Sequence, residues 1–183
     1  PRGVSQNTGG NTNAMTANFS TTATSGNIAV TATNACGASA ATTKSVTVNP
    51  LPTQATTISG TNTVCQGVST VTYVANNLNN GLSFTWTTPN GCNIVGGLNT
   101  KTITVNYDNS STSGPISVFG TNGCGDGPVK NKSITVNPLP DAAGTISGSI
   151  ANNVCPLSTN INYSVAPIAN ATSYTWIYPA GYN

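Results

Sequence analysis

Short runs in which hydrophobic and polar residues alternate recur along the chain. Phe84 and Trp86, for example, alternate with Ser83, Thr85 and Thr87. A period of two residues sends successive side chains to opposite faces of a strand, so that one face is buried and the other meets solvent. No window has the spacing of an amphipathic helix. The pattern predicts an all-β protein, with strands near residues 57–59, 70–73, 83–87, 92–95, 102–107, 116–118 and 134–136.

A long internal repeat accompanies this pattern. Residues 46–52, Val-Thr-Val-Asn-Pro-Leu-Pro, return almost unchanged as residues 134–140, an offset of 88. Residues 57–60, Thr-Ile-Ser-Gly, return at the same offset as residues 145–148. A fixed period of this length is typical of domains strung in tandem. The predicted repeats are the C-terminal half of a first one (residues 1–52), a complete one (53–140) and the N-terminal half of a third (141–183).

After Gly148 the offset between equivalent residues becomes 90, as if two residues were inserted in one loop. Three pairs of equivalent residues follow from these offsets: Cys36 and Cys124, Cys65 and Cys155, and Trp86 and Trp176.

About seven strands in 88 residues are typical of an immunoglobulin-like β-sandwich, which packs two antiparallel sheets face to face. Trp86 is predicted to fill the space between the sheets, where an aromatic side chain buries about 150–250 Å². Its equivalent Trp176 is predicted to be a core residue as well. Residues 49–52, Asn-Pro-Leu-Pro, predict a short, semi-rigid joint between repeats, because proline restricts both its own backbone and that of the residue before it.

Both ends of the chain fall at the same point of the repeat, since residues 1–3 align with residues 89–91 and with residues 179–181. One interpretation is that these residues are a portion of a longer chain. The other is that each chain carries two half-repeats, which neighbouring copies complete as in strand-donating fibres. We prefer the first interpretation, and the second stays open.

The composition narrows the choice of partners. Only 4% of the residues are charged, against about 25% in an average soluble domain, and His and Glu are absent. Polarity comes instead from 31 Thr, 26 Asn and 18 Ser, which suit exposed strand faces and turns. A net charge of +2 without a Lys/Arg cluster argues against nucleic acid as a partner. No apolar stretch approaches the roughly 18 residues of a membrane span, so no membrane insertion is expected.

The search for catalytic or metal-binding residues returns nothing. General acid–base catalysis needs His or a positioned carboxylate, and the three acids, Asp108, Asp126 and Asp141, each fall in a predicted turn. A zinc site needs clustered Cys or His, whereas the two cysteines nearest in sequence, Cys65 and Cys92, are 27 residues apart. The sequence predicts neither an enzyme nor a protein with a cofactor or a metal ion.

The cysteines instead predict disulfides. Cys65 precedes the strand near residues 70–73 and Cys124 follows the strand near residues 116–118, and we expect these two to pair. Their equivalents Cys155 and Cys36 are expected to pair with cysteines outside residues 1–183, or with each other in successive subunits if copies share repeats. Disulfides persist in oxidising compartments, so this pattern favours secretion.

Cys92 has no equivalent in the other repeats, where Val4 and Tyr182 take its place. It is predicted to be a free, partly buried thiol. A Cys65–Cys92 pairing stays open as an alternative.

These motifs together resemble the PKD-like repeats of secreted surface proteins of Bacteroidota, among them giant gliding-motility adhesins and other cargo of type IX secretion. The resemblance implies immunoglobulin-like sandwiches, a disulfide between Cys65 and Cys124, and a core role for Trp86. It rests on Thr-Ile-Ser-Gly (57–60), Val-Cys-x-Gly (64–67), Val-Thr-Tyr (71–73), Phe-Thr-Trp-x-x-Pro-x-Gly (84–91), Asn-x-Cys-Gly-x-Gly (122–127) and Val-Asn-Pro-Leu-Pro (48–52 and 136–140).

The expected function is structural or adhesive: a stalk or filament segment of a long extracellular cell-surface protein. Its expected partners are neighbouring repeats of the same chain or filament, with surface glycans or proteins as further candidates. Two alternatives remain, a glycan- or protein-binding module and a spacer within a secreted enzyme.

Overall fold

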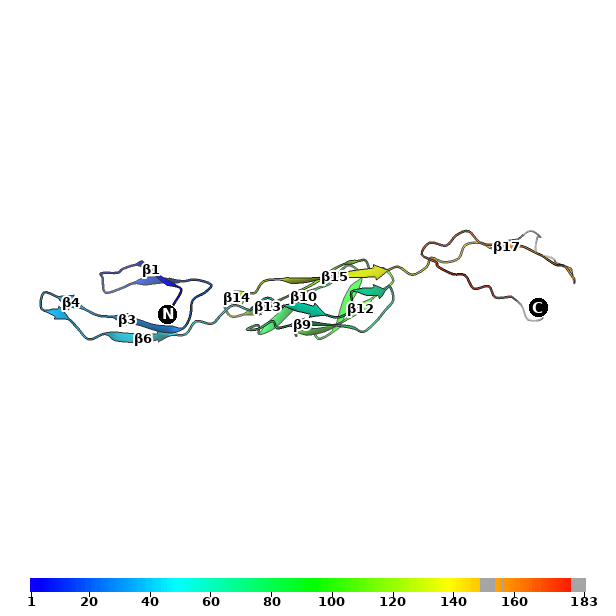
Figure 1. Ribbon diagram of the computed structural model, residues 1–183. Helices are drawn as coiled ribbons and strands as arrows, with labels where there is room; N and C mark the ends of the chain where they lie inside the picture. The colour runs from blue at the N-terminus through cyan, green and yellow to red at the C-terminus, as the bar shows by residue number, and fades with distance from the viewer. Residues whose placement is uncertain (149–153, 156, 179–183) are drawn as a thin grey trace.

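The computed structural model describes residues 1–148, 154–155 and 157–178. Three sections follow one another in space as they do along the chain (Figure 1). We call residues 1–48 the N-terminal section, residues 53–137 the central section and residues 141–178 the C-terminal section. The described residues form strands and no helix, which confirms the predicted all-β fold. Residues 179–181, the predicted copy of residues 89–91, lie outside the described residues.

The first sheet of the central section has four antiparallel strands in the order β11-β12-β9-β7. Along β9 and β12, buried residues alternate with less buried ones. The strands are β7 (Thr57–Ser59), β9 (Val71–Asn76), β11 (Cys92–Gly96) and β12 (Thr102–Tyr107).

The second sheet has the strand order β10-β13-β15-β8, and the short β14 pairs with β13. The pairs of β13 with β10, β14 and β15 are antiparallel, whereas β8 lies parallel to β15. The strands are β8 (Thr63–Cys65), β10 (Ser83–Thr87), β13 (Gly114–Asn122), β14 (Gly125–Asp126) and β15 (Lys130–Asn137).

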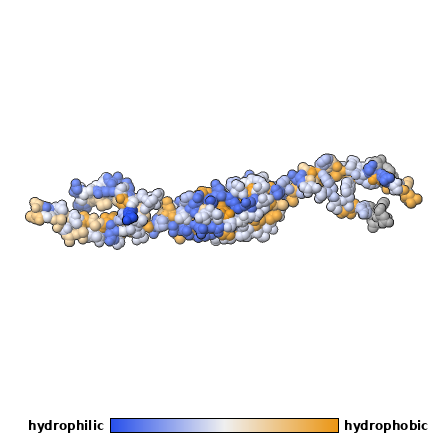
Figure 2. All heavy atoms as spheres, in the orientation of Figure 1, coloured by the Kyte–Doolittle hydropathy of each residue, from blue (hydrophilic) through white to orange (hydrophobic). Residues whose placement is uncertain are grey.

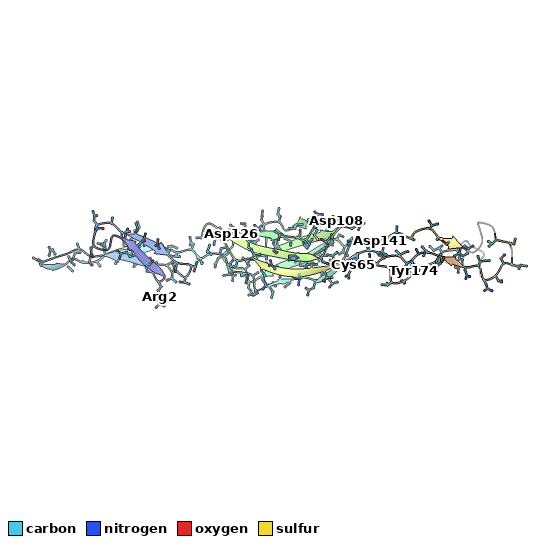
Figure 3. The ribbon with its side chains drawn as sticks, turned by 90° about the horizontal axis from the view of Figure 1, so that it is seen from above. Arg2, Cys65, Asp108, Asp126, Asp141 and Tyr174 are labelled. Atoms are coloured by element: carbon cyan, nitrogen blue, oxygen red, sulfur yellow. The ribbon has the colours of Figure 1, made fainter. Side chains whose placement is uncertain are left out.

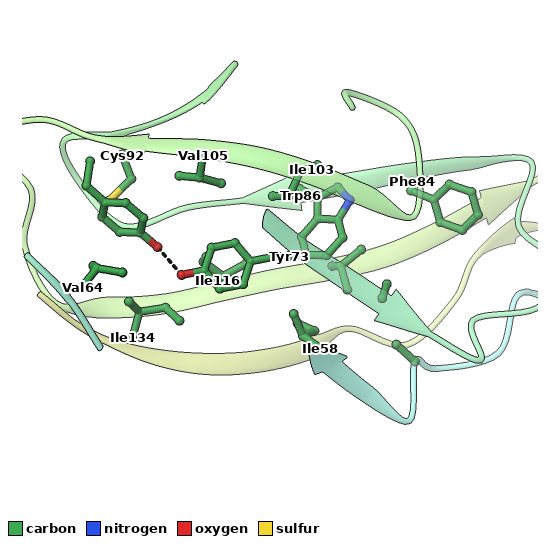
Figure 4. Packing of buried hydrophobic residues seen from close by; sticks show 14 of the residues in the cluster. Ile58, Val64, Tyr73, Phe84, Trp86, Cys92, Ile103, Val105, Ile116 and Ile134 are labelled. Atoms are coloured by element: carbon green, nitrogen blue, oxygen red, sulfur yellow. Dashed lines mark hydrogen bonds between the residues drawn. The ribbon is translucent and has the colours of Figure 1, made fainter. Parts of the chain in front are cut away.

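The hydrophobic core lies between these two sheets (Figure 4). Phe84 and Trp86 of β10 are buried while Ser83, Thr85 and Thr87 are exposed, as the alternation predicts. The central section is thus a β-sandwich of the predicted class, with nine strands where the pattern predicted seven. Its largest fully buried side chains are Tyr73, Tyr107, Leu78, Ile103, Ile116, Val105 and Val118.

The chain changes sheets between β7 and β8, and Gly60 makes this possible. Its φ of +128° lies in a region that residues with a side chain rarely adopt. A Cβ atom at Gly60 would lie 2.4 Å from Cδ1 of Tyr73. The missing side chain therefore lets β7 pair with β9 in one sheet and β8 pair with β15 in the other.

The N-terminal section repeats part of this arrangement. The pairing of β3 with β6 has the register of β13 with β15, since Gly26 faces Val46 as Gly114 faces Ile134. The remaining pairs are β1 with β2 and β4 with β5. The strands are β1 (Val4–Thr8), β2 (Thr16–Phe19), β3 (Gly26–Val30), β4 (Thr33–Asn34), β5 (Gly37–Ala38) and β6 (Thr42–Val46).

The C-terminal section contains one described strand pair, β16 (Ser147–Gly148) with β17 (Tyr163–Ser164). Neither this section nor the N-terminal one has a buried residue among those described. Hydrophobic residues are therefore exposed at the C-terminal end, while the visible face of the central section is mostly hydrophilic (Figure 2). Only the central section, of the described parts of the chain, has a closed core.

Candidate functional site

The carboxylates do not assemble into a catalytic group. The Asp108 carboxylate accepts hydrogen bonds from the side chain and the backbone of Ser110, and these lower its pKa. The Asp126 carboxylate accepts a hydrogen bond of 2.6 Å from Thr121 at the opposite end of the central section. In residues 1–148, 154–155 and 157–178, no three His, Cys, Asp or Glu side chains come together as metal ligands would. Among the described residues there is also no helix long and apolar enough to cross a membrane.

The two tryptophans have different environments. Trp86 lies in the core with 7% of its surface exposed, and its indole N–H donates a hydrogen bond of 2.8 Å to the backbone oxygen of Thr100. Trp176 is 47% exposed, so it is not a core residue in this structure. Trp86 pairs with Val118 of β13, and the described residues of the C-terminal section include no strand in that position beside Trp176.

A polar pair inside the core was not predicted from the sequence. The hydroxyl groups of Tyr73 and Tyr107 are 2.7 Å apart and form a buried hydrogen bond (Figure 4). Burial raises the pKa of both hydroxyl groups. The thiol of Cys92 lies nearby and burial raises its pKa as well. The sequence did contain a clue: both tyrosines fall at the hydrophobic positions of their alternating runs, so both were expected to be buried. A buried hydroxyl group without a hydrogen-bond partner is costly, so a partner for each could have been expected.

The structure places Cys65 and Cys124 at opposite ends of the central section. Cys65 lies opposite Asn137 at the end of β15, whereas Cys124 lies in the turn between β13 and β14. In Figure 3, Asp126 beside Cys124 is labelled at one end of the sandwich and Cys65 at the other. About 23 Å of strand separates Asn137 from Lys130, and Cys124 lies farther still.

A disulfide needs Cα atoms within about 7 Å, and Cys65 and Cys124 are both free thiols. The predicted Cys65–Cys124 disulfide is therefore wrong for this fold. The prediction rested on the places of the two cysteines beside predicted strands, and these places lie at a strand end and in a turn on the surface. Cys92 is a free, buried thiol, so the alternative Cys65–Cys92 bond is not formed either. Cys36 and Cys155 are free and exposed, and their predicted partners outside the chain remain predictions.

The N-terminal and central sections meet at the Asn-Pro-Leu-Pro segment. The side-chain N–H group of Asn122 donates hydrogen bonds to the backbone oxygens of Pro50, at 2.8 Å, and Asn80, at 2.9 Å. Gly127 lies so close to Pro52 that a Cβ atom there would be 2.6 Å from its backbone oxygen. These contacts fix the direction in which the chain enters the central section.

The central and C-terminal sections meet at the second copy of this segment. Gln66 holds it, because its backbone N–H donates to the oxygen of Asn137 at 2.9 Å and its side-chain oxygen accepts from the N–H of Leu139 at 3.1 Å. The side-chain N–H group of Gln66 also donates to the oxygen of Ser111 at 3.0 Å. Gln66 directly follows Cys65, so each exposed cysteine of the central section adjoins one of its two junctions.

Comparison with known proteins agrees with this division of the chain. A family model described as the PKD-like domain matches residues 1–48, 51–136 and 139–183. No curated protein matches the chain significantly. The three matched ranges follow the N-terminal, central and C-terminal sections closely.

Proposed function

Because the chain belongs to the PKD-like domain family, we propose that it is a segment of the stalk or filament of a cell-surface adhesin. PKD-like domains are non-catalytic immunoglobulin-like modules that are typically extracellular. In this proposal residues 53–140 are a complete repeat, residues 1–52 and 141–183 are halves of its neighbours, and the segment has no catalytic activity. A bacterium of the Bacteroidota that exports the protein by type IX secretion is the source we propose.

The order of the sections in space carries the proposal. The N-terminal and C-terminal sections extend from opposite ends of the central sandwich (Figure 1). Each junction is an Asn-Pro-Leu-Pro segment held by side-chain hydrogen bonds from the central section. An array built in this way becomes longer with each repeat and stays slender, which suits a protein that works by reach.

Electron microscopy of the intact protein, as its cells release it, tests this function. The expected image is a thin beaded filament with one bead per repeat of roughly 88 residues, each bead a few nanometres long. A compact particle with two or three beads beside a large globular body contradicts the proposal. That image supports spacer repeats within a secreted enzyme instead.

A groove on the central section favours a second candidate, a glycan- or protein-binding module. It has a volume of about 730 Å³, and its polar lining includes Asn93, Asn106 and Asp108. Amide and carboxylate groups bind the hydroxyl groups of sugars through hydrogen bonds. Binding of residues 49–140 to a glycan array, abolished by Asn106→Ala, is the result expected of a binding module. If residues 49–140 are only a segment of a stalk, they should bind no glycan on the array.

A further inference from the structure

Cys124 lies at the junction between the N-terminal and central sections. Its thiol donates a hydrogen bond of 3.3 Å to the backbone oxygen of Asn49. Asn122 fixes the turn, because its side-chain oxygen accepts from the N–H of Cys124 at 2.8 Å while its N–H group holds Pro50. The thiol is thus held against the junction, and it remains accessible because it is exposed.

A groove of about 440 Å³ opens beside this thiol. It follows the end of β6 and the start of the junction, and the N-terminal section has no strand along this edge. The groove is lined by residues 19–21, 23 and 46–51, together with Cys124.

In the central section the equivalent groove is filled by β8 and the residues after it. Cys65 of β8 lies opposite Asn137, the repeat equivalent of Asn49. The backbone oxygen of Val68 accepts a hydrogen bond of 2.8 Å from Tyr107, and the equivalent of Tyr107 is one of the residues that line the groove. The groove beside Cys124 is thus the place that β8 of the first repeat takes in a complete sandwich.

We propose that cysteines link neighbouring repeats: the cysteine at the Cys65 position of one repeat forms a disulfide with the cysteine at the Cys124 position of the next. A β8 strand in the groove brings its cysteine opposite Asn49, the residue that the Cys124 thiol contacts. Adjacent strands lie about 4.8 Å apart, and a disulfide joins Cα atoms about 4.4–6.8 Å apart. The proposal rests on the end-to-end arrangement of repeats proposed above.

The bond forms by thiol–disulfide exchange with a small-molecule disulfide. One cysteine thiolate attacks this oxidant and releases one thiolate of it. The second cysteine thiolate then attacks the mixed disulfide and releases the other. One S–S bond of the oxidant is reduced for each S–S bond formed, and the protons of the two cysteines end on the two released thiols.

This pairing accounts for the positions of the exposed cysteines. The two exposed cysteines of each complete repeat bond to two different neighbours, which explains why Cys65 and Cys124 lie at opposite ends of one sandwich and are free within it. Cys36 is the equivalent of Cys124, so it bonds to a cysteine of the repeat before its own. Cys155 is the equivalent of Cys65, so it bonds to a cysteine of the repeat after its own. Cys92 is buried between the sheets and takes no part.

A tandem of two copies of residues 49–136, followed by residues 137–140, reproduces one natural junction. Residues 48–52 and 136–140 are identical, so the register of the repeat is kept. Each copy carries the complete core of the central section and is expected to fold. The tandem is refolded in a glutathione redox buffer, its free thiols are blocked, and its peptides are mapped by mass spectrometry without reduction.

The expected result is a peptide pair that joins Cys65 to Cys124 in a monomeric tandem. Cys65→Ser in the first copy abolishes this link. Cys65→Ser in the second copy is the matched control and leaves the link intact, because only the first copy's Cys65 faces the junction. A single copy of residues 49–140 forms no intramolecular link.

A link that survives Cys65→Ser in the first copy, or that forms within the single copy, overturns the proposal, as does a tandem without any link. Small-angle X-ray scattering of the reduced tandem distinguishes a failure of the proposed disulfide from a failure of the end-to-end arrangement of repeats. An elongated but unlinked tandem overturns the disulfide alone, whereas a compact one also contradicts the end-to-end arrangement.

Discussion

At the scale of single residues, the hydrogen bond between Tyr73 and Tyr107 is the main polar feature of the core. Both side chains are almost fully buried, at 0% and 1% exposure, so each hydroxyl group depends on the other. Removing one partner leaves a buried polar group unsatisfied, whereas removing both leaves none. The pair therefore links the neighbouring strands β9 and β12 of the first sheet inside the core.

We predict that Tyr73→Phe lowers the free energy of unfolding of residues 49–140 by about 1–3 kcal/mol. The double variant Tyr73→Phe/Tyr107→Phe is expected to be more stable than the single one, since it has no orphaned hydroxyl group. Urea denaturation of the three proteins measures the difference. A double variant that is less stable than Tyr73→Phe contradicts this view of the pair.

The same residues predict the pH dependence of stability. Burial raises the pKa of Tyr73, Tyr107 and Cys92 above their values in the unfolded chain, about 10 for tyrosine and 9 for cysteine. A raised pKa means that the folded state favours the protonated form, so its stability is complete below the unfolded pKa values and is lost as the pH rises. Thermal unfolding should be constant from about pH 7 to 8 and shift to lower temperature above about pH 9. A smaller shift is expected in the double phenylalanine variant, and an equal shift contradicts the assignment.

At the scale of elements, the step from β7 to β8 depends on Gly60. Alanine at this position combines an unfavourable φ with a contact of 2.4 Å to the ring of Tyr73. We predict that Gly60→Ala destabilises residues 49–140 by at least about 2 kcal/mol. Gly123→Ala is the control, because a Cβ atom there meets no atom within 4 Å and should change stability by less than about 0.5 kcal/mol. Equal effects of the two substitutions in urea denaturation would show that Gly60 is not a structural requirement.

The longer strands were predictable and the shortest were not. The seven predicted runs correspond to β7, β9, β10, β11, β12, β13 and β15, because alternation over several residues reports a half-buried strand directly. β8 and β14 span three and two residues, too few for a period to be visible. β7 also spans only three residues, and its prediction rested on a weaker signal, one isoleucine between two polar residues. Their positions depend on pairing with β15 and β13, which only the tertiary structure reveals.

The cysteines show the limit of sequence-based pairing at this scale. The repeat relates Cys65 to Cys155 and Cys124 to Cys36, but it carries no information on which end of a sandwich each cysteine occupies. That depends on the parallel pairing of β8 with β15, one of the two strands that the alternation did not predict.

At the scale of the whole molecule, the junctions decide whether the array is stiff. Asn122 contributes a side-chain N–H group to the junction and a side-chain oxygen to its own turn. We predict that Asn122→Asp keeps the turn but increases the motion of Leu51, whose amide should show a lower heteronuclear NOE. Asn34→Asp makes the same change in the equivalent turn of the N-terminal section, where the side-chain oxygen of Asn34 accepts from the N–H of Cys36, and it should leave Leu51 unchanged. The same response in both variants contradicts a role of Asn122 in the junction.

The central claim is that repeats of this chain join end to end into a slender array. Small-angle X-ray scattering of tandems with one, two and four copies of residues 49–136, each followed by residues 137–140, tests it most directly. The account predicts that the maximum dimension grows by an equal step of roughly 3–4 nm per copy, the length of a nine-residue strand with its loops. A dimension that levels off as copies are added would show that the repeats fold back on one another, and would contradict the claim.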